Sequence, residues 1–151
     1  MNGDGPDGVA RRAFDRAAVS VAQARLFVSA ALADAGIVSP VVVDSALLAV
    51  SELATNALQH AMCGFEVVVD SAATLRITVI DGSRQLPLMR APSGWDEGGR
   101  GLIIIDATAA RWGVEREGAG KAVWWEIDLP PVSPDGWGGG VGADPETITL
   151  S

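Results

Sequence analysis

The chain has 151 residues, which is enough for one domain and too few for two of ordinary size. Hydrophobic residues make up 48% of it and charged residues 20%, which is a globular composition and excludes a disordered chain. The formal net charge of −8 argues against nucleic acid as the main partner, because binding a phosphate backbone requires a basic surface.

Both ends of the chain have the composition of flexible tails. Residues 1–10 and 131–151 are rich in glycine with few residues to pack, so the expected domain spans residues 11–130. The single cysteine, Cys63, allows no disulfide and is best explained as a small buried hydrophobe in a reducing compartment. The start of the chain does not resemble a signal peptide, and no uninterrupted apolar run is long enough to span a membrane. We therefore expect a soluble cytoplasmic protein.

Two helices are predicted in the first half of the domain. Ser20 and Gln23 form the S-x-x-Q pattern of a capping box, and the apolar residues that follow at helical spacing predict a helix that ends at Gly36. Pro40, directly after a serine, predicts the first turn of a second helix. This second helix is expected to run to about Ala61.

The remaining predicted elements are strands and one further helix. Residues 11–15 are compatible with an edge strand, and apolar runs predict strands at 65–71, 74–81, 112–117 and 122–129. Glycines and prolines across 82–99 predict a long loop, which in a compact domain is usually functional. A third helix is expected after Gly101, to about Ala110. The order predicts an α+β fold, a two-layer α/β sandwich whose mainly antiparallel sheet is covered by about three helices.

A polar line follows one side of the predicted second helix, facing away from its apolar stripe. At 100° per residue, Glu52, Asn56 and His60 fall on this side. A solvated face is the ordinary explanation. Two details favour a site: asparagine has poor helix propensity, and the flanking Ser45 and Ala49 are small. Oxygen ligands above a helix suit a hard cation such as Mg²⁺, and Glu52 is placed to orient or deprotonate a nucleophile.

Two glycine-containing segments are further candidates for a binding site. The segment 98–102 stands just before the third helix, where backbone N–H groups and the Arg100 guanidinium suit a phosphate, although an ordinary glycine loop is an alternative. It lacks the third glycine of a Rossmann fingerprint, and residues 118–122 are not a P-loop. Asp81 and Gly82 end a buried strand. A carboxylate there is placed to accept from the exocyclic amine of adenine, and a simple Asp-Gly turn is the alternative.

Taken in order, four segments resemble the GHKL ATP-binding fold of histidine kinases, gyrase-type ATPases and HSP90. They are "SELATNALQHA" (51–61), "VIDG" (79–82), "GRGLIIIDATAARWGV" (99–114) and "GKAVWWEI" (120–127). Within that group the chain is most similar to the anti-sigma-factor serine/threonine kinases, which include small single-domain regulators of actinomycetes. The resemblance covers about residues 20–129.

The resemblance implies a site for ATP and Mg²⁺. In it Asn56 would coordinate the metal, Glu52 would be the general base for a partner's hydroxyl, and Asp81 would recognise adenine. Gly99, Arg100 and Gly101 would hold the phosphates, and about 84–98 would form a lid. The matching segments also put these residues in the nucleotide site: His60, Gly82, Leu102 and Lys121.

The same resemblance implies a function in transcription regulation by partner switching. The protein would bind a sigma factor and phosphorylate an anti-anti-sigma (antagonist) protein, as a homodimer with the apolar face of the first helix as a candidate interface. No nucleic acid or membrane partner is expected. Two positions depart from the family pattern. Ser83 stands where the family usually has glycine after the aspartate, and Ala122 stands where it usually has threonine. They motivate an alternative, a non-catalytic module that sequesters a regulator and binds nucleotide weakly or not at all.

Overall fold

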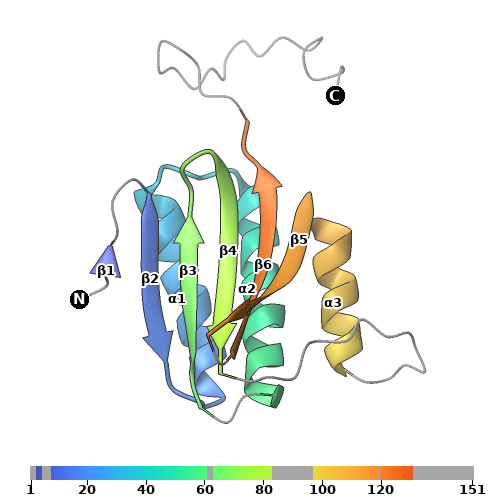
Figure 1. Cartoon of the computed structure of the whole chain (residues 1–151). Coiled ribbons are helices and arrows are strands. Elements are labelled where there is room, and N and C mark those ends of the chain that lie inside the picture. Colours follow the sequence, from blue (N-terminus) through green and yellow to red (C-terminus); the bar gives the residue numbers. More distant parts are fainter. Residues whose placement is uncertain (1–2, 5–7, 61–62, 83–96, 119, 131–151) are drawn as a thin grey trace, which may run out of the picture.

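The sheet of this protein is antiparallel throughout and carries its three helices on one face (Figure 1). The computed structural model describes residues 3–4, 8–60, 63–82, 97–118 and 120–130. Six strands are ordered β1-β2-β3-β4-β6-β5. The elements are β1 (Gly3–Asp4), β2 (Val9–Phe14), α1 (Val19–Asp34), α2 (Pro40–His60), β3 (Phe65–Asp70), β4 (Thr74–Asp81), α3 (Glu97–Thr108), β5 (Arg111–Glu117) and β6 (Gly120–Asp128). The predicted α+β sandwich is confirmed.

The core lies between the sheet and the helix layer. In β4 every second residue is buried, so that Leu75, Ile77 and Val79 face the helices while the residues between them are half-buried on the other face. Helix α2 lies in the middle of the helix layer, with α1 on one side and α3 on the other (Figure 1). This central position explains why α2 is buried around much of its circumference.

Helix α3 is fixed to the closing hairpin by two indole groups. The indole N–H of Trp125, on β6, donates to the Thr108 hydroxyl over 3.0 Å, and that of Trp112, on β5, donates to Asp106 over 2.8 Å. Trp125 is fully buried, so its hydrogen bond satisfies a donor that has no access to water. These contacts hold the C-terminal half of α3 against the sheet.

The predicted capping box at Ser20 is wrong. Helix α1 begins one residue earlier, its N-cap is Ala18, and no side chain caps it. Ser20 is buried within the first turn, and its hydroxyl donates to the Asp15 carbonyl over 2.7 Å. The serine therefore ties the helix to the preceding turn, because burial leaves its hydroxyl no water to bond.

Two other boundaries and the burial of one residue differ from the expectation. Residues 3–4 and 9–10, expected in a loose tail, belong to β1 and β2, because backbone pairing with β3 continues to Val9. Helix α3 begins at Glu97 rather than after Gly101. Cys63 is exposed rather than buried, since it lies in the connection between α2 and β3. The expected tail at 131–151 and residues 84–96 of the lid expected at about 84–98 lie outside the described residues.

Among the described helices, only α2 is long and apolar enough to cross a membrane, by length and composition alone. The stretch is Pro40–Gln59, with a mean hydropathy of 1.5. Val50, Leu53 and Ala57 of this stretch are buried in the core beneath it. Packing against the sheet therefore accounts for its apolar residues.

Candidate functional site

Four chain segments that carry the predicted site residues meet at one end of the domain. The C-terminal end of α2, the end of β4, the start of β6 and the N-terminal end of α3 all lie at the lower end in Figure 1. Helix α2 packs against both α3 and β4. The fold therefore brings segments that are far apart in the sequence, from α2 to β6, to one end of the domain.

The polar line of α2 does not face away from the core, and this part of the prediction is wrong. Asn56 is only 7% exposed, and Ala49, on the same side, is fully buried, whereas Glu52 is half-buried. The reason is the central position of α2, whose sides are covered by α1, α3 and the sheet. Glu52 and Asn56 lie one helical turn apart, so the carboxylate and the carboxamide share one side of the helix. The last residue of α2 is His60.

Asn56 is nearly buried, with 7% of its surface exposed. No hydrogen bond joins it to any other described side chain or backbone group. An amide in so confined a place that makes no bond to the described protein is available to a ligand, an ion or water. The Asn56 oxygen is thus a suitable ligand for a hard cation such as Mg²⁺.

Asp81 and Lys121 form a buried ion pair across two central strands. They are register partners at the end of β4 and the start of β6. The Lys121 ammonium lies 3.1 Å from Oδ1 and 3.0 Å from Oδ2 of Asp81, and the two side chains are only 1% and 2% exposed. Burial of two charges is tolerated because each neutralises the other. Removing one partner alone would leave an uncompensated buried charge.

Gly120 allows the two strands that carry this pair to approach closely. A Cβ at Gly120 would lie 1.9 Å from the Asp81 carbonyl oxygen, so only glycine fits there. Gly82 follows Asp81 and is exposed, and a Cβ there would lie 3.3 Å from the sulfur of Cys63. The exposed cysteine therefore lies beside the predicted site.

The predicted phosphate-binding residues lie in the first turns of α3 rather than in a loop before it. Gly99, Arg100 and Gly101 are within Glu97–Thr108, and Leu102 of the next turn is buried. A helix start still offers unpaired backbone N–H groups and partial positive charge, so this shift keeps the electrostatics that favour a phosphate.

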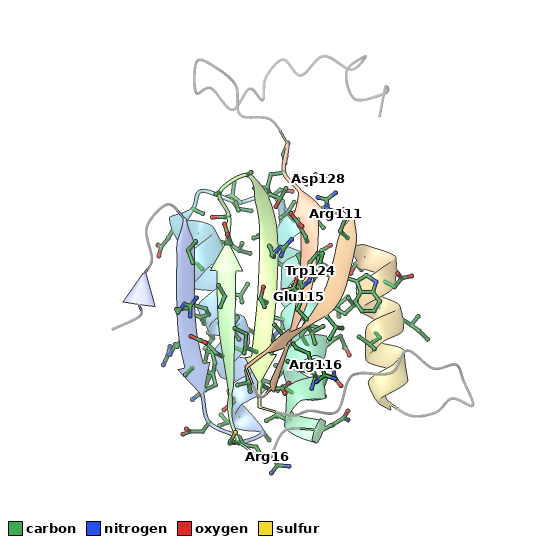
Figure 2. All side chains as sticks on the ribbon, in the orientation of Figure 1. Arg16, Arg111, Glu115, Arg116, Trp124 and Asp128 are labelled. Atoms are coloured by element: carbon green, nitrogen blue, oxygen red, sulfur yellow. The ribbon has the colours of Figure 1, made fainter. Side chains whose placement is uncertain are left out.

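Sequence reasoning missed the groups that hold the site in place. Arg16, in the turn before α1, donates to the Leu58 carbonyl in the last turns of α2 over 3.3 Å, and Figure 2 shows Arg16 at the same lower end. A cation at a helix C-terminus also interacts favourably with the helix dipole. The ion pair of Lys121 with Asp81 was missed as well. Its only signal is the register between β4 and β6, which are not consecutive in the chain, and a single sequence does not fix that register.

The chain is similar to known proteins in sequence and in fold. A family model described as "Histidine kinase-like ATPase domain" matches residues 14–127. An uncharacterized protein of Streptomyces coelicolor, SCO4941, is 36% identical over 95 residues, covering 54% of this chain and 85% of that protein. The solved structure of the RsbU and RsbW domains of Rv1364c from Mycobacterium tuberculosis superposes with a TM-score of 0.60 at 19% identity, over 80% of this chain. This chain spans a third of that one, and the likeness concerns the fold.

Proposed function

The chain belongs to the histidine kinase-like ATPase domain family, and from this premise we propose that it is an ATP- and Mg²⁺-dependent anti-sigma factor kinase. Its substrate would be a serine or threonine of an anti-anti-sigma protein, and its second partner a sigma factor. Family membership implies ATP binding. The observation that carries the finer proposal is Glu52, one turn before the buried Asn56 on the helix that packs against α3.

Each residue of the site has a proposed task. Asn56 would hold Mg²⁺ through its carboxamide oxygen, and the metal would neutralise charge on the phosphates. Glu52 would accept the proton of the attacking hydroxyl. The α3 residues Gly99, Arg100 and Gly101 would bind the phosphates, and Asp81 would accept from the adenine amine. We further assign His60, Gly82, Leu102 and Lys121 to the walls of this site.

The kinase proposal is tested by phosphate transfer from labelled ATP to a panel of purified anti-anti-sigma proteins. Glu52→Gln keeps the size of the side chain but removes the base, so transfer should fall by about 100-fold or more while ATP still binds. Glu66→Gln is the matched control, because Glu66 lies on β3, on the sheet face away from the helices, in an ion pair with Arg11. Undiminished transfer by the Glu52 variant would overturn the assignment.

A non-catalytic binding module is the second candidate. It is favoured by Ala122, which offers no hydrogen bond where the family has threonine, and by the occupation of the Asp81 carboxylate by Lys121. Calorimetry with Mg²⁺ and millimolar ATP distinguishes the kinase from the binding module. Absence of heat, together with capture of a purified sigma factor, would favour the module.

Location and assembly are also part of the proposal. We expect the protein to act in the cytoplasm through a domain at 11–130, with tails on both sides. We expect a homodimer that binds neither nucleic acid nor membrane, in keeping with the net charge of −8.

A further inference from the structure

The buried ion pair uses only two of the three hydrogens that Lys121 can donate. An ammonium carries three N–H groups, and both close polar contacts of Lys121 among the described residues end on the same Asp81 carboxylate. Among the described residues no other group accepts from it. With the lysine side chain only 1% exposed, water gives little compensation for the third donor. The third N–H group of Lys121 therefore has no acceptor among the described residues, beside the Asp81 carboxylate.

The pair lies at the site end of the sheet, on the face that the helices cover. Asp81 continues the alternation of the core residues Ile77 and Val79, and Lys121 is two residues before the buried Val123. The two side chains therefore project from neighbouring strands toward the layer that contains α2 and α3. This is the end at which the proposed nucleotide site lies.

We propose that Lys121 is a second base-reading residue, which donates to the N1 ring nitrogen of adenine while Asp81 accepts from the neighbouring exocyclic amine. This inference rests on the proposed nucleotide site. Adenine presents a donor and an acceptor side by side on this edge. A carboxylate and an ammonium held 3.0 Å apart offer the complementary acceptor and donor. Lys121 thereby supplies the polar contact that Ala122 lacks.

The experiment compares two nucleotides that differ in one atom. In 1-deaza-ATP a C–H group replaces N1, so the lysine loses its acceptor while the exocyclic amine remains. We expect the wild-type protein to bind ATP about tenfold or more tightly than 1-deaza-ATP, as for loss of one hydrogen bond to a charged group. Isothermal titration in Mg²⁺ gives both affinities.

Two variants connect this ratio to Lys121. Lys121→Met keeps the length of the side chain and removes every donor, so the two nucleotides should bind about equally. Lys121→Gln keeps an N–H₂ group and should retain part of the preference. Purine riboside triphosphate, which lacks the exocyclic amine, reports on Asp81 and should bind more weakly than ATP to the wild type and to both variants. Circular dichroism establishes that each variant is folded.

The outcomes separate the inference from the function on which it rests. Equal binding of ATP and 1-deaza-ATP by the wild-type protein overturns the inference alone, whatever the variants do. A preference that persists in Lys121→Met overturns it too, since the donor must then be another group. Absence of any ATP binding by the wild type removes the proposed function, and the inference with it.

Discussion

A single amide in the core of α2 carries much of the proposed chemistry. Asparagine is a poor helix former because its side chain competes for backbone hydrogen bonds, and burial adds the cost of an amide without water. Asn56 is only 7% exposed, in a helix of 21 residues where alanine or leucine would pack more favourably. A ligand that completes its hydrogen bonding or coordination would offset that cost when bound.

Replacing Asn56 by alanine should separate affinity from stability. We predict that Asn56→Ala lowers the affinity for ATP at least about tenfold in Mg²⁺ but little in EDTA, because only metal-dependent binding requires the carboxamide oxygen. The free energy of unfolding should stay the same or rise slightly, since no described hydrogen-bond partner is lost. Thr55→Ala, on the next residue, is the control for titration calorimetry and urea unfolding. An equal loss of affinity with and without Mg²⁺ would contradict the role in metal binding.

Glu126 gives a residue-scale prediction away from the site. Its hydrogen bond from Thr74, together with the guanidinium groups of Arg76 and Arg111, holds the pKa of this carboxyl below its usual value. The ion pair of Arg111 with Asp128 extends the network, and Figure 2 shows both residues at the end of the sheet opposite Arg16.

A lowered pKa stabilises the folded state above the unfolded value and is lost on acidification. The contribution of Glu126 should therefore be complete above about pH 5 and should decline as pH falls through the folded pKa. We predict that Glu126→Gln lowers the urea midpoint at neutral pH and makes it less dependent on pH below about 4.3. The control is Glu115→Gln on β5, an exposed glutamate. Parallel pH profiles for wild type and Glu126→Gln would contradict the assignment.

At the scale of elements, the strands and the long helices could be predicted, because their patterns have a physical period. Apolar alternation gives β4 its buried face, and Pro40 marks the start of α2. The start of α3 could not be predicted, because three glycines in its first turns have poor helix propensity. Only tertiary contacts, such as that of Trp125 with Thr108, compensate for this poor propensity.

The site was predictable in its residue types but not in its contacts. The spacing of Glu52 and Asn56 implies a shared helix side in any helix. Burial of Asn56 depends on α1 and α3 covering α2, which local periodicity does not contain. The pairing of Asp81 with Lys121 depends in the same way on which strands become neighbours and in which register.

Close packing of β4 against β6 gives a prediction at this scale. Gly120→Ala should lower the free energy of unfolding by about 3 kcal/mol, because its Cβ would overlap the Asp81 carbonyl and the two strands would have to separate. That separation also moves Lys121 from Asp81, so ATP affinity should fall as well. Gly36→Ala is the control: its Cβ meets open space, and its φ of +78° costs only about 1 kcal/mol. Urea unfolding measures the free energy of unfolding of both variants, and equal losses of stability would contradict the steric argument.

At the scale of the whole molecule, the outer side of α1 carries large exposed apolar residues beside its polar ones, Gln23, Arg25 and Asp34. Its outward side presents Val19, which is 59% exposed, and Leu26, which is 71% exposed, together with alanines. An outer helix of a monomer normally presents charged and polar residues to water. Helix α1 also lies on the side of α2 away from α3, so a partner bound there would leave the site end of α3 accessible.

We therefore predict that a homodimer forms through the outer face of α1. Leu26→Glu puts a charge in the centre of that face, so it should convert the dimer to a monomer that remains folded, because Leu26 contributes little to the core. Ile103→Glu is the matched control, an equally drastic change on exposed α3 that should leave the mass unchanged. Sedimentation equilibrium over a range of concentrations measures both. A wild-type protein that remains monomeric would contradict the prediction, as would a Leu26→Glu variant that still dimerises, since the interface would then lie on another element.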